Sequence, residues 1–80
     1  MVRIMLILGK IVVRMVVDDG QVSTVYVLST CGTHGTITIK RSCEENQRTL
    51  YRGSIDDCWN AWYTMKANLA DEIIEYKEVR

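Results

Sequence analysis

The chain has eighty residues, no net charge at neutral pH, and 48% hydrophobic against 25% charged residues. This length allows a single domain over residues 1–80 and excludes a second core, and the hydrophobic content excludes a disordered chain. Zero net charge argues against a general nucleic-acid binder, which needs an excess of Lys and Arg, and equally against an acidic nucleic-acid mimic.

The three cysteines are an odd number and do not suggest a closed disulfide framework. The apolar run Ile4–Leu8 is too short for a signal peptide and no small-residue cleavage site follows it. No stretch approaches about 18 consecutive apolar residues, so we expect no transmembrane helix. The sequence therefore predicts a reduced, cytoplasmic protein without a membrane partner.

Residues 2–28 are rich in β-branched residues and predict three strands, separated by turns at Gly9-Lys10 and Asp19-Gly20. Asp-Gly suits a type I′ turn, in which both central residues need positive φ, and Gly-Lys suits a type II′ turn. Two further strands follow. Residues 29–35 are predicted to form a loop, Thr36–Arg41 a fourth strand, and Arg48–Arg52 a short edge strand.

The two turns fix a register, and alternation then sorts the side chains of residues 2–28 onto two faces. In this register Val13 lies opposite Tyr26 and Ile11 lies opposite Leu28. One face is almost wholly apolar and is the predicted core: Ile4, Leu6, Leu8, Ile11, Val13, Met15, Val17, Val22, Tyr26 and Leu28. The other face mixes aliphatic residues with arginine and serine: Arg3, Met5, Ile7, Val12, Arg14, Val16, Ser23, Val25 and Val27.

The last third of the chain predicts one long helix over about residues 55–76. Ser54 is a good N-cap, and Asp57 three residues later resembles a capping box. Apolar residues recur at helical spacing along one stripe: Ile55, Cys58, Trp59, Trp62, Met65, Leu69 and Ile73. Residues 72–79 are compatible with either helix or strand, and we expect helix to about Tyr76.

Together these elements predict an α+β fold, with an antiparallel sheet of four or five strands over about residues 2–52 and the long helix packed on one face. Trp59 and Trp62 lie three positions apart on the helix. Either both tryptophans belong to the core, or one lies at the rim, where it would form an aromatic anchor beside Tyr63.

A different structure for the N-terminus is conceivable. Arg3, Ile7, Lys10 and Arg14 would share one face of a helix, which would make residues 2–16 a basic membrane-surface helix. The glycine in the middle of this segment and its many valines and isoleucines favour the strand prediction.

Four residues have the types that a closed tetrahedral zinc site needs, namely Cys31, His34, Cys43 and Cys58. Their spacing lacks a paired C-x-x-C, so we expect no metal and no cofactor. The alternative is a small zinc-supported domain, either an accessory subunit or a protein that contacts nucleic acid through Lys10, Lys40 and Arg41.

Catalysis is not expected. Cys31 and His34 could form a nucleophile and base, but no third residue is identifiable that would orient the histidine. The segment Gly32–Gly35 is not followed by a helix and lacks the lysine of a phosphate-binding loop. We predict that the chain is not an enzyme.

The best functional indication is the sheet face that a single helix cannot cover. An uncovered face with aliphatic residues and embedded arginine is typical of an interface, although valines kept only for strand propensity would look similar. The predicted partner-binding residues are Arg3, Met5, Ile7, Val12, Arg14, Val16, Val25 and Val27.

These features predict a non-catalytic protein-binding module that occludes or bridges a larger protein complex, or that forms a homodimer through this face. Small, neutral chains without motifs are common among phage and mobile-element products, including anti-CRISPR proteins. By this analogy of size and architecture alone, an inhibitor of a host defence complex is our specific hypothesis.

Overall fold

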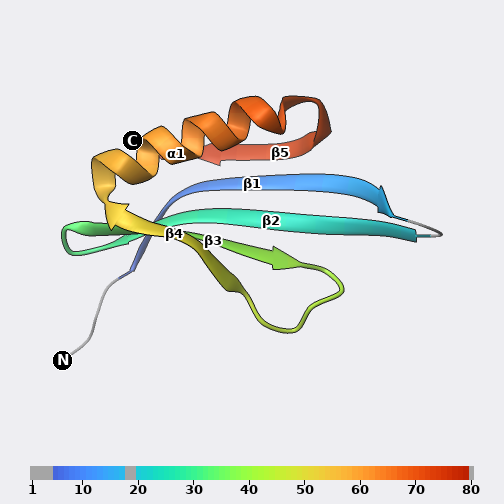
Figure 1. Ribbon diagram of the computed structural model, residues 1–80, viewed down its shortest axis with the longest axis horizontal. Coiled ribbons are helices and arrows are strands. Elements are labelled where there is room, and N and C mark those ends of the chain that lie inside the picture. Colours follow the sequence, from blue (N-terminus) through green and yellow to red (C-terminus); the bar gives the residue numbers. More distant parts are fainter. Residues whose placement is uncertain (1–4, 18–19, 80) are drawn as a thin grey trace.

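A computed structural model describes residues 5–17 and 20–79 of the chain (Figure 1). The elements in chain order are β1 (Leu6–Val17), β2 (Gly20–Cys31), β3 (His34–Arg41), β4 (Arg48–Ser54), α1 (Ile55–Asn68), the short 3₁₀ helix η1 (Ala70–Glu72) and β5 (Ile73–Glu78). The strands form one antiparallel five-stranded sheet in the order β4-β3-β2-β1-β5, and α1 packs against it. The predicted α+β fold is confirmed, as is the edge position of β4.

The predicted turn at Gly9-Lys10 is wrong, because β1 continues through these residues as one twelve-residue strand. Gly9 pairs with Leu28 of β2, and a bulge next to it leaves Leu8 without a partner residue. A Cβ at Gly9 would lie 2.8 Å from Cζ2 of Trp62. This glycine therefore serves the close approach of an indole ring to the strand, which sequence alone does not distinguish from a turn.

The hairpin at Asp19-Gly20 is present but shifted by one residue. Val17 pairs with Gly20, so Gly20 begins β2, while residues 18–19 lie outside the described part of the chain. Ile11 consequently pairs with Tyr26, two residues from the predicted partner. A shift of two residues keeps every side chain on its predicted face, because side chains alternate with a period of two.

The predicted loop over residues 29–35 is largely strand. β2 continues to Cys31 and β3 starts at His34, which leaves a two-residue turn with Gly32 at φ 70°. Gly35 belongs to β3, and a Cβ there would lie 2.8 Å from the Cys58 sulfur atom. Like Gly9, it lets α1 approach the sheet closely.

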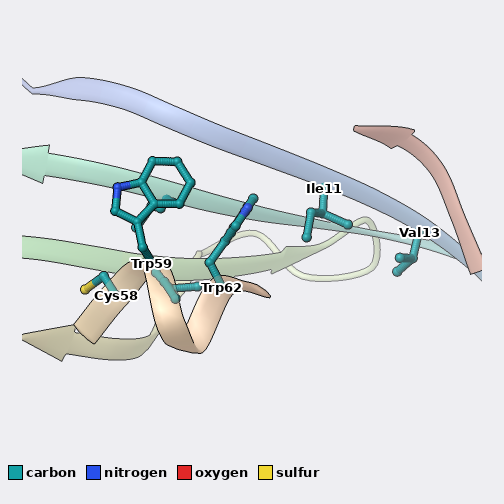
Figure 2. Close-up of a cluster of buried hydrophobic side chains, with 7 residues drawn as sticks. Ile11, Val13, Cys58, Trp59 and Trp62 are labelled. Carbon is teal, nitrogen blue, oxygen red and sulfur yellow. The ribbon is translucent and has the colours of Figure 1, made fainter. Parts of the chain in front are cut away.

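The predicted start of the helix is confirmed. The backbone N–H of Asp57 donates to Ser54 Oγ at 3.2 Å, which satisfies one of the free donors of the first turn and is worth about 1 kcal/mol. Trp59 and Trp62 are both buried and point from α1 toward the strands (Figure 2), so both belong to the core. They pack there with buried aliphatic residues of the sheet such as Ile11 and Val13.

The predicted helix end is wrong, because α1 stops at Asn68 and residues 73–78 form β5. β5 pairs with β1, and Trp62 Nε1 donates a hydrogen bond of 3.2 Å to the hydroxyl of Tyr76. That hydroxyl donates in turn to Glu78 Oε1 at 2.6 Å. Burial raises the pKa of Tyr76, and the hydrogen bond to Glu78 raises it further. If α1 continued through residues 73–78, the Trp62–Tyr76 and Tyr76–Glu78 hydrogen bonds would be lost. The edge of β1 that faces away from β2 would also stay unpaired.

The short helix leaves part of the sheet uncovered. β5 pairs with β1 only from Gly9 to Val13, and β3 pairs with β2 only from Thr24 onward. The far end of the β1–β2 hairpin therefore extends beyond α1 and β5 (Figure 1). Met15 and Val16, on opposite faces of this arm, are 45% and 76% exposed.

We predict that Gly9→Ala destabilises the protein by about 1–3 kcal/mol, because the new methyl group overlaps the Trp62 ring. Gly20→Ala is the matched control, since a Cβ there meets nothing within 4 Å. Urea unfolding followed by tryptophan fluorescence measures both changes. Equal stability of the two variants would show that the indole does not rest on Gly9.

We also predict that Tyr76→Phe lowers the free energy of unfolding by about 1–3 kcal/mol, because it leaves the buried Trp62 Nε1 without an acceptor. Tyr26→Phe is the control, because the Tyr26 hydroxyl bonds no residue in the described part of the chain. Its expected effect is below about 0.5 kcal/mol. Thermal unfolding by circular dichroism compares the two, and a Tyr76→Phe protein as stable as the control would contradict the prediction.

Candidate binding surface

The sheet surface opposite α1, here called the open face, is defined by the strand register. Residues that pair across neighbouring strands point to the same side, so the pairs Val12–Val25 and Val27–Thr38 identify the members of this face. They include Ile7, Lys10, Val12, Arg14, Val16, Gln21, Ser23, Val25, Val27, Ser29, Cys31, His34, Thr36, Thr38, Lys40, Thr49, Arg52, Glu75 and Lys77. Met5 immediately precedes β1 and, together with Ile7, lines a cavity on this face that is described below.

The open face contains every predicted partner-binding residue that the structure describes, while Arg3 lies outside the described residues. Val16, Met5 and Ile7 are 76%, 63% and 57% exposed. Arg14 is also exposed, whereas the three remaining valines are half-buried: Val12, Val25 and Val27. The described members of the predicted set therefore lie on one face, with Arg14 among aliphatic side chains, and their role in partner binding stays a prediction.

Basic residues dominate the charge of the open face. Lys10 forms an ion pair with Glu75, the acidic residue of this face, with 3.6 Å between Nζ and Oε2. The other basic side chains form no ion pair with any described residue: Arg14, Lys40, Arg52 and Lys77. Exposed acids gather instead in α1 and η1, at Asp56, Asp57, Asp71 and Glu72. Among the described residues the open face is thus predominantly basic, while α1 and η1 present exposed acids on the other side.

A cavity of about 390 Å³ opens on this face over β2, β3 and β4. Hydrogen-bonding side chains form one part of its lining: Ser29, Thr30, Thr36, Thr38, Gln47, Thr49 and Arg52. Met5, Ile7 and Val27 form an apolar wall, with Cys31 also in the lining. The sequence prediction missed this cavity, although the alternation of threonine with the inward Ile37 and Ile39 was a usable signal.

A groove on the helical side was also missed. It has a volume of about 690 Å³, lies between α1 and strands β2 to β4, and is lined by Tyr26, Leu50, Tyr51 and Met65 among others. A hollow of about 360 Å³ continues it along the β1–β2 hairpin. The groove exists because α1 has only fourteen residues, about 21 Å, whereas β1 spans about 40 Å.

The prediction of a fully covered core face therefore needs correction. Ile11, Val13 and Leu28 are buried as predicted, but Leu6 and Met15 are 57% and 45% exposed. Leu8, Val22 and Tyr26 are half-buried. Ile4 lies outside the described residues, and the side chain of Val17 is not described.

The four zinc-ligand candidates do not meet. Cys31 and His34 pair across the β2–β3 turn, and Cys58 lies in α1 near Gly35. Cys43 follows the opposite end of β3, a strand about 26 Å long. Within residues 5–17 and 20–79, no three His, Cys, Asp or Glu side chains lie close enough to hold a metal ion. The zinc alternative gains no support from this arrangement.

The Cys31 and His34 pair shows no catalytic geometry. His34 Nδ1 lies 3.3 Å from the hydroxyl of Thr33, and its hydrogen bond is with that hydroxyl rather than with the Cys31 thiol.

The alternative prediction of an N-terminal amphipathic helix is wrong, because β1 begins at Leu6. No helix in the described part of the chain has the length and apolar character needed to cross a bilayer.

Comparisons with protein-family models, curated proteins and solved structures found no match to this chain. The function must therefore be argued from the geometry and charge of the surfaces described above.

We predict that the three thiols react at very different rates. Cys31 and Cys43 are exposed, whereas Cys58 is buried and donates weakly to the Gly53 carbonyl oxygen at 3.9 Å. Burial raises the pKa of the Cys58 thiol, so it stays protonated at a pH where an ordinary cysteine has begun to ionise. At about pH 8.5, iodoacetamide should label Cys31 and Cys43 in the native protein and Cys58 only after denaturation. Mass spectrometry of the peptides checks this order, and rapid native labelling of Cys58 would contradict it.

Proposed function

We propose that this protein is a non-catalytic binding module that attaches through its open face to an acidic surface of a larger protein. The observation that carries the proposal is the group of basic side chains, unpaired among the described residues, around exposed aliphatic ones. Exposed lysine and arginine without local partners attract an acidic surface and speed association with it.

The aliphatic residues supply the apolar contact that such a complex needs. Val12 and Val25 are direct cross-strand neighbours, and Ile7 and Val16 lie toward opposite ends of β1. Exposed aliphatic groups gathered on one face favour an interface, since burying them on binding gains about 25 cal/mol per Å² of apolar area. Arginine is enriched at interfaces and Arg14 lies among these residues.

The composition of the open face favours a protein partner over a nucleic acid. Tyr26, Tyr51 and Tyr76 point to the helical side of the sheet, and the remaining aromatic residues lie in α1. The described part of the open face therefore has no tryptophan or tyrosine on which bases could stack. The zero net charge of the chain points the same way.

A second copy of this chain is a poorer partner for the open face. Pairing two such faces would bring their unpaired basic side chains together, and like charges at an interface oppose association. An acidic partner removes this repulsion. We therefore propose a heteromeric complex, with a homodimer as an outcome that would contradict it.

Occlusion or bridging of a larger complex is the role that we propose for a module of this kind. An inhibitor of a host defence complex, made by a phage or another mobile element and acting in the cytoplasm as anti-CRISPR proteins do, is the specific form of this proposal. It is supported by the analogy of size and architecture alone.

The expected outcome is that Arg14→Glu and Val16→Asp each weaken partner binding by at least about tenfold. Both side chains are exposed, so the thermal midpoint should move by less than about 2 °C. Leu50→Asp is the matched control, because Leu50 is 51% exposed and lines the groove on the helical side rather than the open face.

The partner is first recovered by affinity purification from the cells that produce the protein, and its affinity for each variant is then measured by calorimetry. Equal binding by all three variants and the parent would contradict the proposal. So would recovery of nucleic acid alone, or a homodimer in light scattering that Arg14→Glu dissociates.

A further inference from the structure

The polar lining of the cavity on the open face follows from the strand register. Ser29, Thr36 and Arg52 form one row across β2, β3 and β4, and Val27, Thr38 and Thr49 form the next. Neighbours within a row lie about 5 Å apart. Hydroxyl groups from three strands and one guanidinium group therefore gather around a single space of about 390 Å³.

Ser29 indicates that this space is built to receive a ligand. The residue is only 6% exposed, yet its hydroxyl bonds no described residue. No fully enclosed side-chain oxygen or nitrogen in the described part of the chain lacks a partner. The Ser29 hydroxyl must therefore reach the cavity, where it has hydrogen-bonding capacity to offer.

Thr30 donates to the His34 carbonyl oxygen at 2.8 Å, but the polar side chains on β3, β4 and the loop between them are unused. Thr36, Thr38, Thr49, Gln47 and Arg52 make no side-chain hydrogen bond or ion pair with a described residue. Among the described residues, no acidic side chain lines the cavity. A guanidinium group surrounded by hydroxyl donors is suited to an anion, and a carboxylate matches it geometrically.

The apolar wall narrows the choice of anion. Met5, Ile7 and Val27 line the same space, and a bare inorganic ion would leave them unused. A glutamate side chain has two methylene groups that can contact this wall while its carboxylate reaches Arg52. Such a group is what an acidic protein surface presents.

We infer that this cavity is the anchor site of the open face and that it takes a glutamate side chain of the partner. The inference rests on the proposed function and deepens it. The remaining basic residues of the face that form no ion pair with a described residue, such as Arg14 and Lys40, then contact other acids around the anchored one.

A capped hexaglutamate peptide is the probe for this site, and ¹H–¹⁵N correlation spectra are the readout. At low ionic strength the peptide should shift the amide signals of residues around Ser29, Thr38 and Arg52. Arg52→Gln should weaken its binding at least about fivefold, and Thr38→Val, which removes one hydroxyl at nearly constant volume, about threefold.

Arg48→Gln is the matched control. It removes the same charge from the same strand, but Arg48 pairs with Ile39 on the helical side. Its guanidinium Nη2 also forms an ion pair with Glu44 Oε1 at 3.6 Å. Its affinity for the peptide should stay within about twofold of the parent. Equal losses in Arg52→Gln and Arg48→Gln would show attraction by net charge alone and would overturn the inference.

Two further titrations identify the source of the anion. Inorganic phosphate should bind more weakly than the peptide, because it cannot use the apolar wall. Tighter binding of phosphate, or of an oligothymidylate, would overturn the assignment to glutamate.

The failure of this inference can be told apart from that of the proposed function. If Arg14→Glu and Val16→Asp weaken the partner complex but Arg52→Gln and Thr38→Val do not, the open face is the interface and the cavity is not its anchor. If hexaglutamate occupies the cavity but no open-face variant affects the partner, the proposed function fails while the site stands.

Discussion

The contact between Trp62 and Gly9 is the constraint on which the rest of this structure depends. The indole is fully buried against the backbone of β1 at a position where even a methyl group would overlap it. Its Nε1 donates to Tyr76 of β5, so one side chain of α1 connects two neighbouring strands. The glycine lets the helix approach closely, and the tyrosine satisfies a polar group that burial would otherwise leave unpaired.

This contact determines which surfaces the helix can cover. α1 starts at the Ser54 cap beside the edge strand β4 and reaches β1 and β5 through Trp62. Being about 10 Å wide and only fourteen residues long, it leaves the far end of the β1–β2 hairpin and a groove beside β4 uncovered. The whole open face stays uncovered by any described element, because one helix can pack on only one side of a sheet.

Charge follows the same division into two layers. The strands carry basic residues on the open face that form no ion pair with a described residue, while α1 and η1 carry exposed acids at Asp56, Asp57, Asp71 and Glu72. A net charge of zero hides this separation, which in our proposal directs the open face toward an acidic partner. The threonine-lined cavity adds hydrogen-bonding groups to the open face, so the proposed surface combines long-range attraction with a specific anchor.

The sequence by itself determined the Ser54 cap, the inward Ile37 and Ile39, and the sorting of the β1–β2 side chains onto two faces. These depend on local hydrogen bonding and on a period of two, which a two-residue register shift leaves unchanged. For the same reason Arg14 and the aliphatic members of the open face were predictable, whereas the positions of Lys10, Arg52 and Lys77 on it were not.

Tertiary structure alone decided the rest. From the sequence, Gly9 is expected in a turn. Only the tertiary structure shows that it lies within the continuous strand β1, where it makes room for the Trp62 ring. The segment from Ile73 is compatible with helix or strand, and pairing with β1 together with the Tyr76 hydrogen bond selects strand. The cavity requires Ser29, Thr36 and Arg52 to stand in one row, and that depends on a register set by strands far apart in the chain.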